Sequence, residues 1–289
     1  WSFVAADDLD NSDTQQVSFT LKATDGDMDV DTATQTITIT DGDGPSWGGE
    51  VDSVNLTVDE AALSVLGGDT GSNPGSDAET DGSSLQFKAG SDAIDSIVFG
   101  DTSGISIDGI DTSNVVWTLS DGGRTLTGAV VVGNVSEDVL RLSLGGASTV
   151  AVGDTGTVTV TAELLGNLLH QDAPNAGSLV VSGITVVGAD DDGDSLSADV
   201  TVTVTDDVPD VAIATAPNTV VEGESLTTGS WSLNAGADGA TVAVIVGGES
   251  YALGTPIDTG KGILTVAVGG TWSFVAADDL DNSDTQQVS

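Results

Sequence analysis

Val and Ile alternate with Thr along several short stretches of the chain. In the stretch from Thr34 to Thr40, Ile37 and Ile39 stand on alternate positions, and from Asp199 to Thr205 a Val falls on every second position. This period of two places the apolar side chains on one face, as in a strand with one buried side. Turn-forming residues, mainly Gly, Asp, Ser, Thr and Asn, lie between such stretches. The pattern predicts an all-β protein with many short strands and tight turns.

Two internal repeats set the expected domain limits. The segment 272–289 repeats the segment 1–18 (WSFVAADDLDNSDTQQVS) letter for letter, so that Trp272 takes the place of Trp1. Within that long unit, the segment 24–43 aligns without gaps with the segment 189–208: an Asp-rich loop, an alternating strand and a closing Thr-Asp. Near-identical repetition is typical of proteins built as linear arrays of repeated units. We therefore expect this chain to be a slice of a longer array.

The aligned strands mark the ends of two domains. After each comes an acidic linker with a proline, then a Val-rich segment with an acidic residue: NLTVDEAAL from Asn55 and NTVVEGESL from Asn218. We therefore expect the C-terminal part of a domain at 1–43, a complete, larger domain at 44–207, and the start of another at 208–289. Joined through the overlap, the segments 208–271 and 1–43 reach the size of an immunoglobulin-like sandwich, which is about 100 residues. The predicted fold is a tandem, elongated array of immunoglobulin-like (cadherin-like) Greek-key β-sandwich domains.

The split predicts a partner for each end. Neither end segment can close a sandwich alone, so each exposes an apolar face and open strand edges. We expect these halves to pair with neighbouring repeats of the same protein, or head-to-tail between or within molecules.

Charge adds a requirement for cations. The chain has 46 Asp and Glu against 5 Lys and Arg, a formal net charge of -41. A compact chain with this charge repels itself, and bound cations or salt offset the repulsion. Binding to nucleic acid or to an anionic membrane surface is not expected, because it needs Lys and Arg. No apolar run is long enough to insert into a bilayer.

Calcium is the expected ion, because it binds six to eight oxygen ligands in irregular geometry. The chain has no Cys and a single His170, which disfavours zinc. Acidic residues cluster in the two aligned loops, in the linkers and at the starts of the following domains. The predicted calcium ligands are Asp25, Asp27, Asp29, Asp31, Asp41, Asp43, Glu60, Asp190, Asp192, Asp194, Asp206, Asp207, Asp210 and Glu222. One ion that bridges loop, linker and following Glu would lock two domains in line; a solvated, flexible acidic linker is the alternative.

A further acidic cluster follows Trp1-Ser-Phe-Val4, which we expect to be a strand. It comprises Asp7, Asp8, Asp10, Asn11 and Asp13, and it recurs from Asp278. Its composition fits a calcium loop and a polar hairpin tip equally well.

An enzyme is not expected. A nucleophile–base–acid triad needs a base, and the lone His170 is more readily structural. The sequence contains no GxSxG motif, and the segment 67–75 (GGDTGSNPG) lacks the Lys of a phosphate-binding loop. The five Trp and one Tyr are few for a sugar-binding groove.

Several segments in order resemble one family. VDEAAL from Val58, AETDGSSLQFKAGSDAIDSIVFG from Ala78, WTLSDGGRTLTG from Trp117, AELLGNLLHQDAPNAGSL from Ala162 and VVGADDDGDSLSADVTVTVTDDVPD from Val186 resemble the extender repeat of giant, type I-secreted RTX-type bacterial adhesins. The flanking segments are similar to the immunoglobulin- or cadherin-like repeats of the same proteins. The resemblance implies secretion, retention at the outer surface of a Gram-negative bacterium, and calcium-dependent rigidity.

The expected function is therefore a calcium-rigidified extender that projects a distal binding domain for surface attachment or biofilm formation. The alternative is a ligand-binding adhesive module that recognises a glycan, ice or a host surface. Repetition of a unit lengthens a rod, but it also multiplies weak binding sites.

Overall fold

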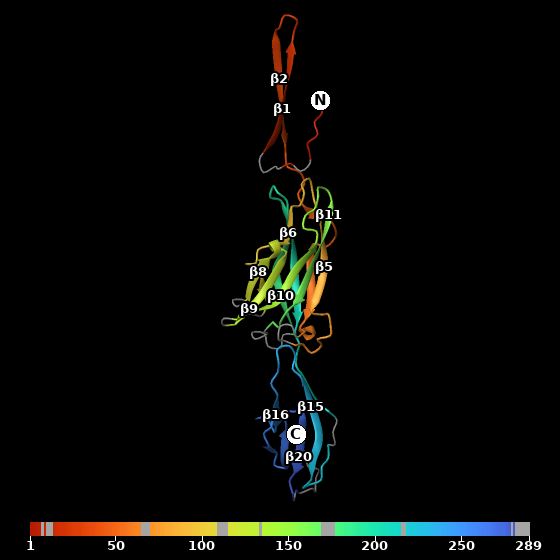
Figure 1. Ribbon diagram of the computed structural model, residues 1–289, viewed down its shortest axis with the longest axis vertical. Coiled ribbons are helices and arrows are strands. Elements are labelled where there is room, and N and C mark those ends of the chain that lie inside the picture. The colour runs from red at the N-terminus through yellow and green to blue at the C-terminus, as the bar shows by residue number, and fades with distance from the viewer. Residues whose placement is uncertain are drawn as a thin grey trace. The chain divides into compact units, whose positions relative to one another are not determined.

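A computed structural model describes residues 1–6, 9, 14–64, 70–108, 115–132, 135–168, 177–214, 218–278 and 280. The chain divides into two compact units, which are described separately (Figure 1). Unit 1 comprises residues 1–59 and 77–206, and unit 2 comprises residues 60–76 and 207–289.

Unit 1 contains a sandwich of two sheets. The six-stranded sheet has the order β3 (Ser46–Trp47), β5 (Thr80–Lys88), β11 (Thr155–Leu164), β10 (Val135–Gly146), β9 (Thr125–Val132) and β8 (Val115–Ser120). The second sheet has the order β4 (Ser53–Asp59), β13 (Ser195–Thr205), β12 (Ser178–Ala189) and β6 (Ser96–Phe99), with β7 (Ser106–Ile107) also paired to β12. β4 lies parallel to β13, whereas the other pairs are antiparallel. A short 3-10 helix, η4 (Asp121–Gly123), joins β8 to β9.

The core of unit 1 follows from the alternation seen in the sequence. In β13 every second residue from Ala198 to Val204 is buried, and β11 alternates in the same way. β4 packs against β5 and β11 of the opposite sheet, where Phe87 is fully buried and its ring meets that of Trp47, with ring centroids 5.2 Å apart. Each sheet thus has one face in the core, as in a β-sandwich.

A two-stranded hairpin precedes the sandwich. It consists of β1 (Gln15–Thr24) and β2 (Val30–Ile39), which are antiparallel (Figure 1). Apart from a few half-buried side chains, all its residues are exposed.

Unit 2 has a five-stranded sheet and a separate hairpin. The sheet has the order β14 (Asp210–Ile213), β15 (Ser225–Asn234), β20 (Thr271–Ala276), β19 (Gly262–Val266) and β18 (Ile257–Asp258), and β16 (Ala243–Val246) pairs with β17 (Glu249–Ala252). A 3-10 helix, η1 (Glu60–Ala62), also belongs to this unit. Only a few of its described apolar side chains are buried, among them Ile257 and Ala276.

The structure confirms the predicted all-β, sandwich class of fold, and the expected strands at 34–40 and 199–205 lie at the ends of β2 and β13. One strand prediction was wrong. Residues 1–4 are not in a strand, although the same letters at 272–275 lie in β20. In unit 2, residues 272–275 lie in β20, which is hydrogen-bonded to β15 on one side and β19 on the other. Residues 1–4 pair with no strand among the described residues, and a segment without such partners does not stay in a strand. The domain limits at 43/44 and 207/208 stay a prediction.

Among the described residues, no helix is long and apolar enough to span a bilayer.

Candidate metal centre

Three segments of unit 1 bring carboxylates together. Asp41 follows β2 in the linker, Asp92 lies between β5 and β6, and Asp192 lies in the loop that joins β12 to β13. One carboxylate oxygen from each of the three lies within 4.8 Å of the other two. Because calcium–oxygen distances are about 2.4 Å, two ligands of one ion lie up to about 5 Å apart. The spacing of the three carboxylates therefore fits a single calcium ion.

The β12–β13 loop is held in shape by Asp190. Its Oδ1 accepts hydrogen bonds from the amides of Gly193 (3.2 Å) and Asp194 (2.7 Å), and its own amide donates to Asp194 O (3.1 Å). Gly193 has a φ of 107°, a conformation that favours glycine. This turn directs Asp192 towards Asp41 and Asp92.

The second oxygen of Asp190 and both oxygens of Asp192 are buried, and they have no hydrogen-bond donor among the described residues. Asp190 is only 9% exposed and Asp92 only 3%. Burial of an ionised carboxylate without a donor is costly, and a bound cation removes that cost. These donor-less oxygens are an observation independent of the acidic cluster, and they point to a cation at the same place.

The same crowding affects ionisation. The pKa of Asp192 is raised, first because its carboxyl can share a proton with Asp190, then by burial and by repulsion from Asp190 and Asp41. Without a cation, the group therefore holds its proton to higher pH than an ordinary carboxyl does.

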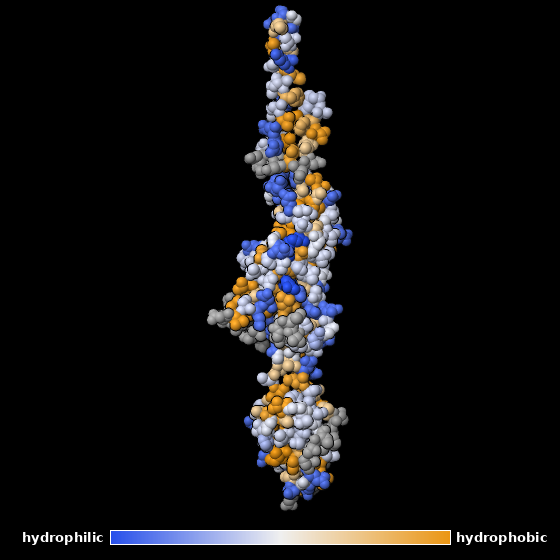
Figure 2. Space-filling model, viewed as in Figure 1, coloured by the Kyte–Doolittle hydropathy of each residue, from blue (hydrophilic) through white to orange (hydrophobic). Residues whose placement is uncertain are grey.

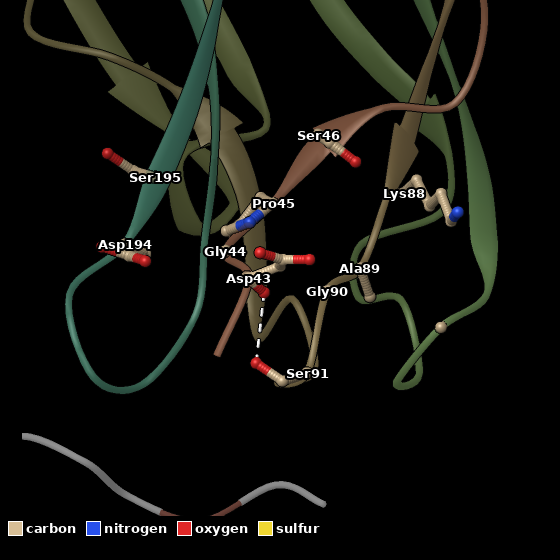
Figure 3. A pocket seen from close by; sticks show the side chains of 11 residues that line it. Asp43, Gly44, Pro45, Ser46, Lys88, Ala89, Gly90, Ser91, Asp194 and Ser195 are labelled. Atoms are coloured by element: carbon tan, nitrogen blue, oxygen red, sulfur yellow. Dashed lines mark hydrogen bonds between the residues drawn. The ribbon is translucent and has the colours of Figure 1, made fainter. Parts of the chain in front are cut away.

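Asp43 and Asp194 lie beside this cluster without joining it. Both line an open pocket of about 780 Å³ between the linker, the β12–β13 loop and the end of β5 (Figure 3). Asp43 acts through its carbonyl, which accepts hydrogen bonds from the amide (2.9 Å) and Oγ (3.2 Å) of Ser91. The Ser91 hydroxyl also lies 2.8 Å from Oδ2 of Asp92. The linker is thus fastened next to the Asp92 carboxylate.

The hairpin loop of β1–β2, which is the aligned copy of the β12–β13 loop in the internal repeat, shares two of its hydrogen bonds. Asp25 Oδ1 accepts from the amides of Asp27 (3.3 Å) and Asp29 (2.8 Å), and the Asp25 amide donates to Asp29 O (3.1 Å). Carboxylate oxygens of these three residues lie within 4.8 Å of one another, but all three residues are exposed. The pKa of Asp25 is lowered, first by a hydrogen bond with the Asp27 side chain and then by the Asp29 amide. This loop therefore brings its own carboxylates together, as the β12–β13 loop does, but it has no buried carboxylate such as Asp92 beside it among the described residues.

Unit 2 has its own acidic pair. Glu60 of η1 is fully buried, and one of its carboxylate oxygens lies within 4.8 Å of one from Asp238. Asp207 has a different role, because Ser72 donates to its two oxygens through the amide (2.7 Å) and the hydroxyl (2.6 Å). These bonds satisfy the Asp207 carboxylate without an ion.

The structure does not bring three of the predicted ligands, Asp31, Asp210 and Glu222, into a carboxylate group among the described residues. Asp31 is exposed in β2 and accepts from the Thr32 amide, and Asp210 is exposed at the start of β14. Glu222 accepts from the Leu280 amide at 3.2 Å. Asp206 is the last residue of unit 1, and its amide donates to Gly177 O. The acidic cluster at residues 7–13 and His170 lie outside the described residues, apart from Leu9.

The prediction from sequence missed Asp92 and Asp238. Both occur in the same short motif after a strand, Ala-Gly-Ser-Asp at 89–92 and Ala-Gly-Ala-Asp at 235–238. In each, a Cβ on the glycine would collide with a linker carbonyl, Asp43 O for Gly90 and Asp207 O for Gly236. The glycine is needed for this close approach, and the motif could have been found as a third internal repeat.

A pH effect follows from the raised pKa of Asp192. Its neutral form stabilises unit 1 at pH values below the ordinary pKa of 3.8, and this contribution is lost as the pH rises through the raised folded-state pKa. In EDTA, lowering the pH from 7 towards 3.8 should therefore raise the melting temperature, and Asp192→Asn should show a smaller rise. Thermal melts at several pH values measure both.

Asp101→Asn is the control for this pH effect. The pKa of Asp101 is lowered, first by the Ser103 hydroxyl and then by the Ser103 amide, so its contribution has the opposite sign and is lost as the pH falls. This substitution should leave the rise intact or enlarge it. An equal pH response in wild type and Asp192→Asn would contradict the assignment.

Comparisons with known proteins give no family. No family model and no curated protein matches the sequence. Among solved structures, mouse protocadherin-24 EC1-3 is 12% identical with a TM-score of 0.29, covering 93% of this chain and 68% of that one. Mouse clustered PcdhgC3 EC1-3 is 11% identical with a TM-score of 0.27, covering 98% and 71%. A family 123 glycoside hydrolase from Clostridium perfringens is 13% identical with a TM-score of 0.25, covering 54% of this chain and 23% of the hydrolase. Likenesses this remote do not bear on the activity of the chain.

Proposed function

We propose that this chain is a calcium-stiffened extender of a large, secreted bacterial surface adhesin, and that it holds a distal binding domain away from the cell for attachment or biofilm formation. The observation that supports this is the set of buried, donor-less oxygens of Asp190 and Asp192 beside Asp41 and Asp92. The family assignment and the secreted location both rest on the sequence resemblance.

Calcium would act on the linker. Asp41 lies in the linker two residues after the end of β2, whereas Asp92 and Asp192 belong to the sandwich. One ion held by all three would therefore tie the linker to the sandwich. Bound calcium also supplies positive charge where carboxylates crowd. Extracellular calcium sites of this kind have dissociation constants of roughly 10⁻⁴ to 10⁻³ M, so the linker would be stiff outside the cell and loose where calcium is scarce.

The test is solution scattering of the whole chain in calcium and in EDTA. Calcium should increase the maximum dimension of the chain and narrow the distribution of interatomic distances. Half of this change should be reached at a calcium concentration of roughly 10⁻⁴ to 10⁻³ M. Asp41→Asn should raise the midpoint about tenfold or more, because it removes a charged ligand from the linker. Asp31→Asn, an exposed carboxylate in the preceding strand, should behave as wild type. A distance distribution that is the same in calcium and EDTA would refute the spacer mechanism.

A further inference from the structure

β8 is the last strand of the six-stranded sheet in unit 1, and no strand among the described residues pairs with its outer edge. Alternate residues of such an edge strand direct their main-chain amides and carbonyls away from the sheet, where they can accept a further strand. The sequence of β8 is Val-Val-Trp-Thr-Leu-Ser. It contains no charged residue and no proline, which are the residues that usually prevent the addition of a strand. The main chain of β8 is therefore able to pair with another strand.

The other edges of the two sheets in unit 1 are short or blocked. β3, at the opposite edge of the same sheet, has only two residues. β4 is an edge of the second sheet, but Oδ2 of Asp81 accepts a hydrogen bond from the Thr57 amide at 2.8 Å, which occupies a donor of that edge. The opposite edge is divided between β6 and β7, which have four and two residues. β8, with six residues, is the long edge without such a block among the described strands.

Both faces of β8 also leave apolar side chains in contact with water. Val116 on the outer face is 51% exposed, and Leu119 on the inner face is 39% exposed. The ring of Trp117 lies over Gly128 of β9, where a Cβ would come within 2.6 Å of the ring. Figure 2 shows apolar side chains at the surface in the region that β8 and β9 occupy in Figure 1. A strand added at this edge would cover part of this apolar surface.

Charge favours a second copy of this chain as the added strand. β8 and its neighbour β9 carry no ionisable side chain, in a chain with 46 Asp and Glu and a net charge of -41. Two such chains repel each other, so they approach most easily where both lack charge. A basic partner would instead be drawn to the acidic parts of the surface, because complementary charge steers association.

The strand is also complementary to itself. When β8 pairs antiparallel with its own copy about a two-fold axis through Trp117, Val116 lies opposite Thr118 and Val115 lies opposite Leu119 of the second copy. The same faces of the two sheets then stay on the same side, and the apolar cross-strand pairs add to the main-chain hydrogen bonds. Because each molecule uses the same surface, the contact closes as a dimer.

We propose that two copies of this chain associate side by side through their β8 edges, which pair antiparallel and join the two six-stranded sheets into one. A pairing of this length supplies about four to six main-chain hydrogen bonds and buries less area than a standard interface, so we expect a dissociation constant of roughly 10⁻⁵ to 10⁻³ M. The contact needs no calcium and does not depend on the proposed extender function. In an adhesin of the proposed kind, it would join neighbouring molecules laterally.

Substitutions of Thr118, which is exposed on the outer face, test the edge. Thr118→Asp and Thr118→Lys each place two like charges opposite or diagonal to one another across the axis. Each variant alone should therefore dimerise about tenfold more weakly than wild type. Ser84→Asp is the matched control, because it adds a charge at an exposed position of β5, which β9, β10 and β11 separate from β8.

The first measurement is sedimentation equilibrium of the full chain in EDTA, with NaCl at about 0.15 M and at about 0.5 M. Up to about 1 mM protein, the upper limit of the expected dissociation constant, the mean mass of wild type and of Ser84→Asp should rise from 28.7 kDa towards twice that value and no further. The dimer should be tighter at the higher salt, because the repulsion is screened. At the lower salt, an equimolar mixture of Thr118→Asp and Thr118→Lys should dimerise more strongly than either variant alone.

The second measurement locates the contact by spin labels, which a chain without Cys allows at a single introduced Cys. Labels on Thr118→Cys should lie within about 20 Å of each other in the dimer, since adjacent strands are about 4.8 Å apart. Labels on Thr161→Cys of β11 should be at least about 30 Å apart, because β9 and β10 lie between β11 and β8 in each copy.

Wild type that stays monomeric at the higher salt would overturn the inference. Dimerisation of Thr118→Asp as strong as that of wild type at the lower salt would do the same, as would a mixture that associates no better than its components. A dimer in which the labels at position 161 are closer than those at position 118 would place the contact elsewhere and would also overturn it.

Discussion

Chelation of calcium should lower the melting temperature of unit 1 by about 5–10 °C, given that 1 kcal/mol corresponds to about 2–4 °C for a unit of this size. The reason is linkage: an ion that binds only the folded state stabilises it by about 2.7 kcal/mol per site when its concentration is about 100 times the dissociation constant. Differential scanning calorimetry in calcium at about 10 mM, well above the expected dissociation constant, and in EDTA measures the shift.

The variant Asp92→Asn tests whether this shift in melting temperature comes from the group formed by Asp41, Asp92 and Asp192. The substitution removes one charge from a buried ligand but keeps an oxygen that can accept the Ser91 hydroxyl, 2.8 Å away. It should abolish most of the calcium-dependent gain. In EDTA the variant should match or exceed wild type, because one repelling carboxylate is gone.

Asp95→Asn is the matched control in the same loop, where the side chain is exposed. It should keep the full gain. If Asp92→Asn and Asp95→Asn lose the gain equally, general screening of charge explains the effect and the Asp92 site does not.

Arg124→Met should destabilise unit 1 by about 2–4 kcal/mol, or about 5–15 °C in melting temperature. The guanidinium donates to three main-chain carbonyls, Ile97 O (2.9 Å), Ala147 O (3.2 Å) and Leu144 O (2.9 Å). Ile97 belongs to β6 and Leu144 to β10, so the side chain ties the two sheets together. Met keeps the apolar stem but leaves these carbonyls without their charged donor.

Arg141→Met tests whether the position or the charge matters. Both variants remove one of only 5 cationic side chains, but Arg141 pairs with Glu163 at the surface, where the two side chains are 44% and 40% exposed. Exposed ion pairs contribute about 0–1 kcal/mol. Equal destabilisation of the two variants by urea denaturation would show that Arg124 has no specific role between the sheets.

The Asp25–Asp29 loop and the proposed calcium site have the same origin in the repeat. The Asp25–Asp29 loop shares two hydrogen bonds with the Asp190–Asp194 loop, but its carboxylates are exposed and lack a counterpart of Asp92 nearby among the described residues. Unit 2 holds Asp238 in the motif that carries Asp92 in unit 1.

The sequence by itself determined the class of fold and the periodic strands. Val and Ile at every second position specify one buried face, and the alignment of 24–43 with 189–208 predicted two related Asp-rich loops. In the structure the first Asp of each loop accepts a hydrogen bond from the amide four residues later. These features are local or repetitive, so they can be read from the order of residues. The predicted ligands Asp41 and Asp192 could be found in this way because they lie in the repeated segments.

Tertiary structure alone decided which carboxylates meet and which segments become strands. Asp92 joins Asp41 and Asp192 only because the fold places the end of β5 next to the β12–β13 loop. These two segments are far apart in the sequence. Asp207, predicted as a ligand, is instead satisfied by Ser72, 135 residues away. The letters WSFVA form a strand at 272–276 and none at 1–5. A strand persists only where neighbouring strands take up its main-chain hydrogen bonds, and the order of residues within the segment does not contain that information.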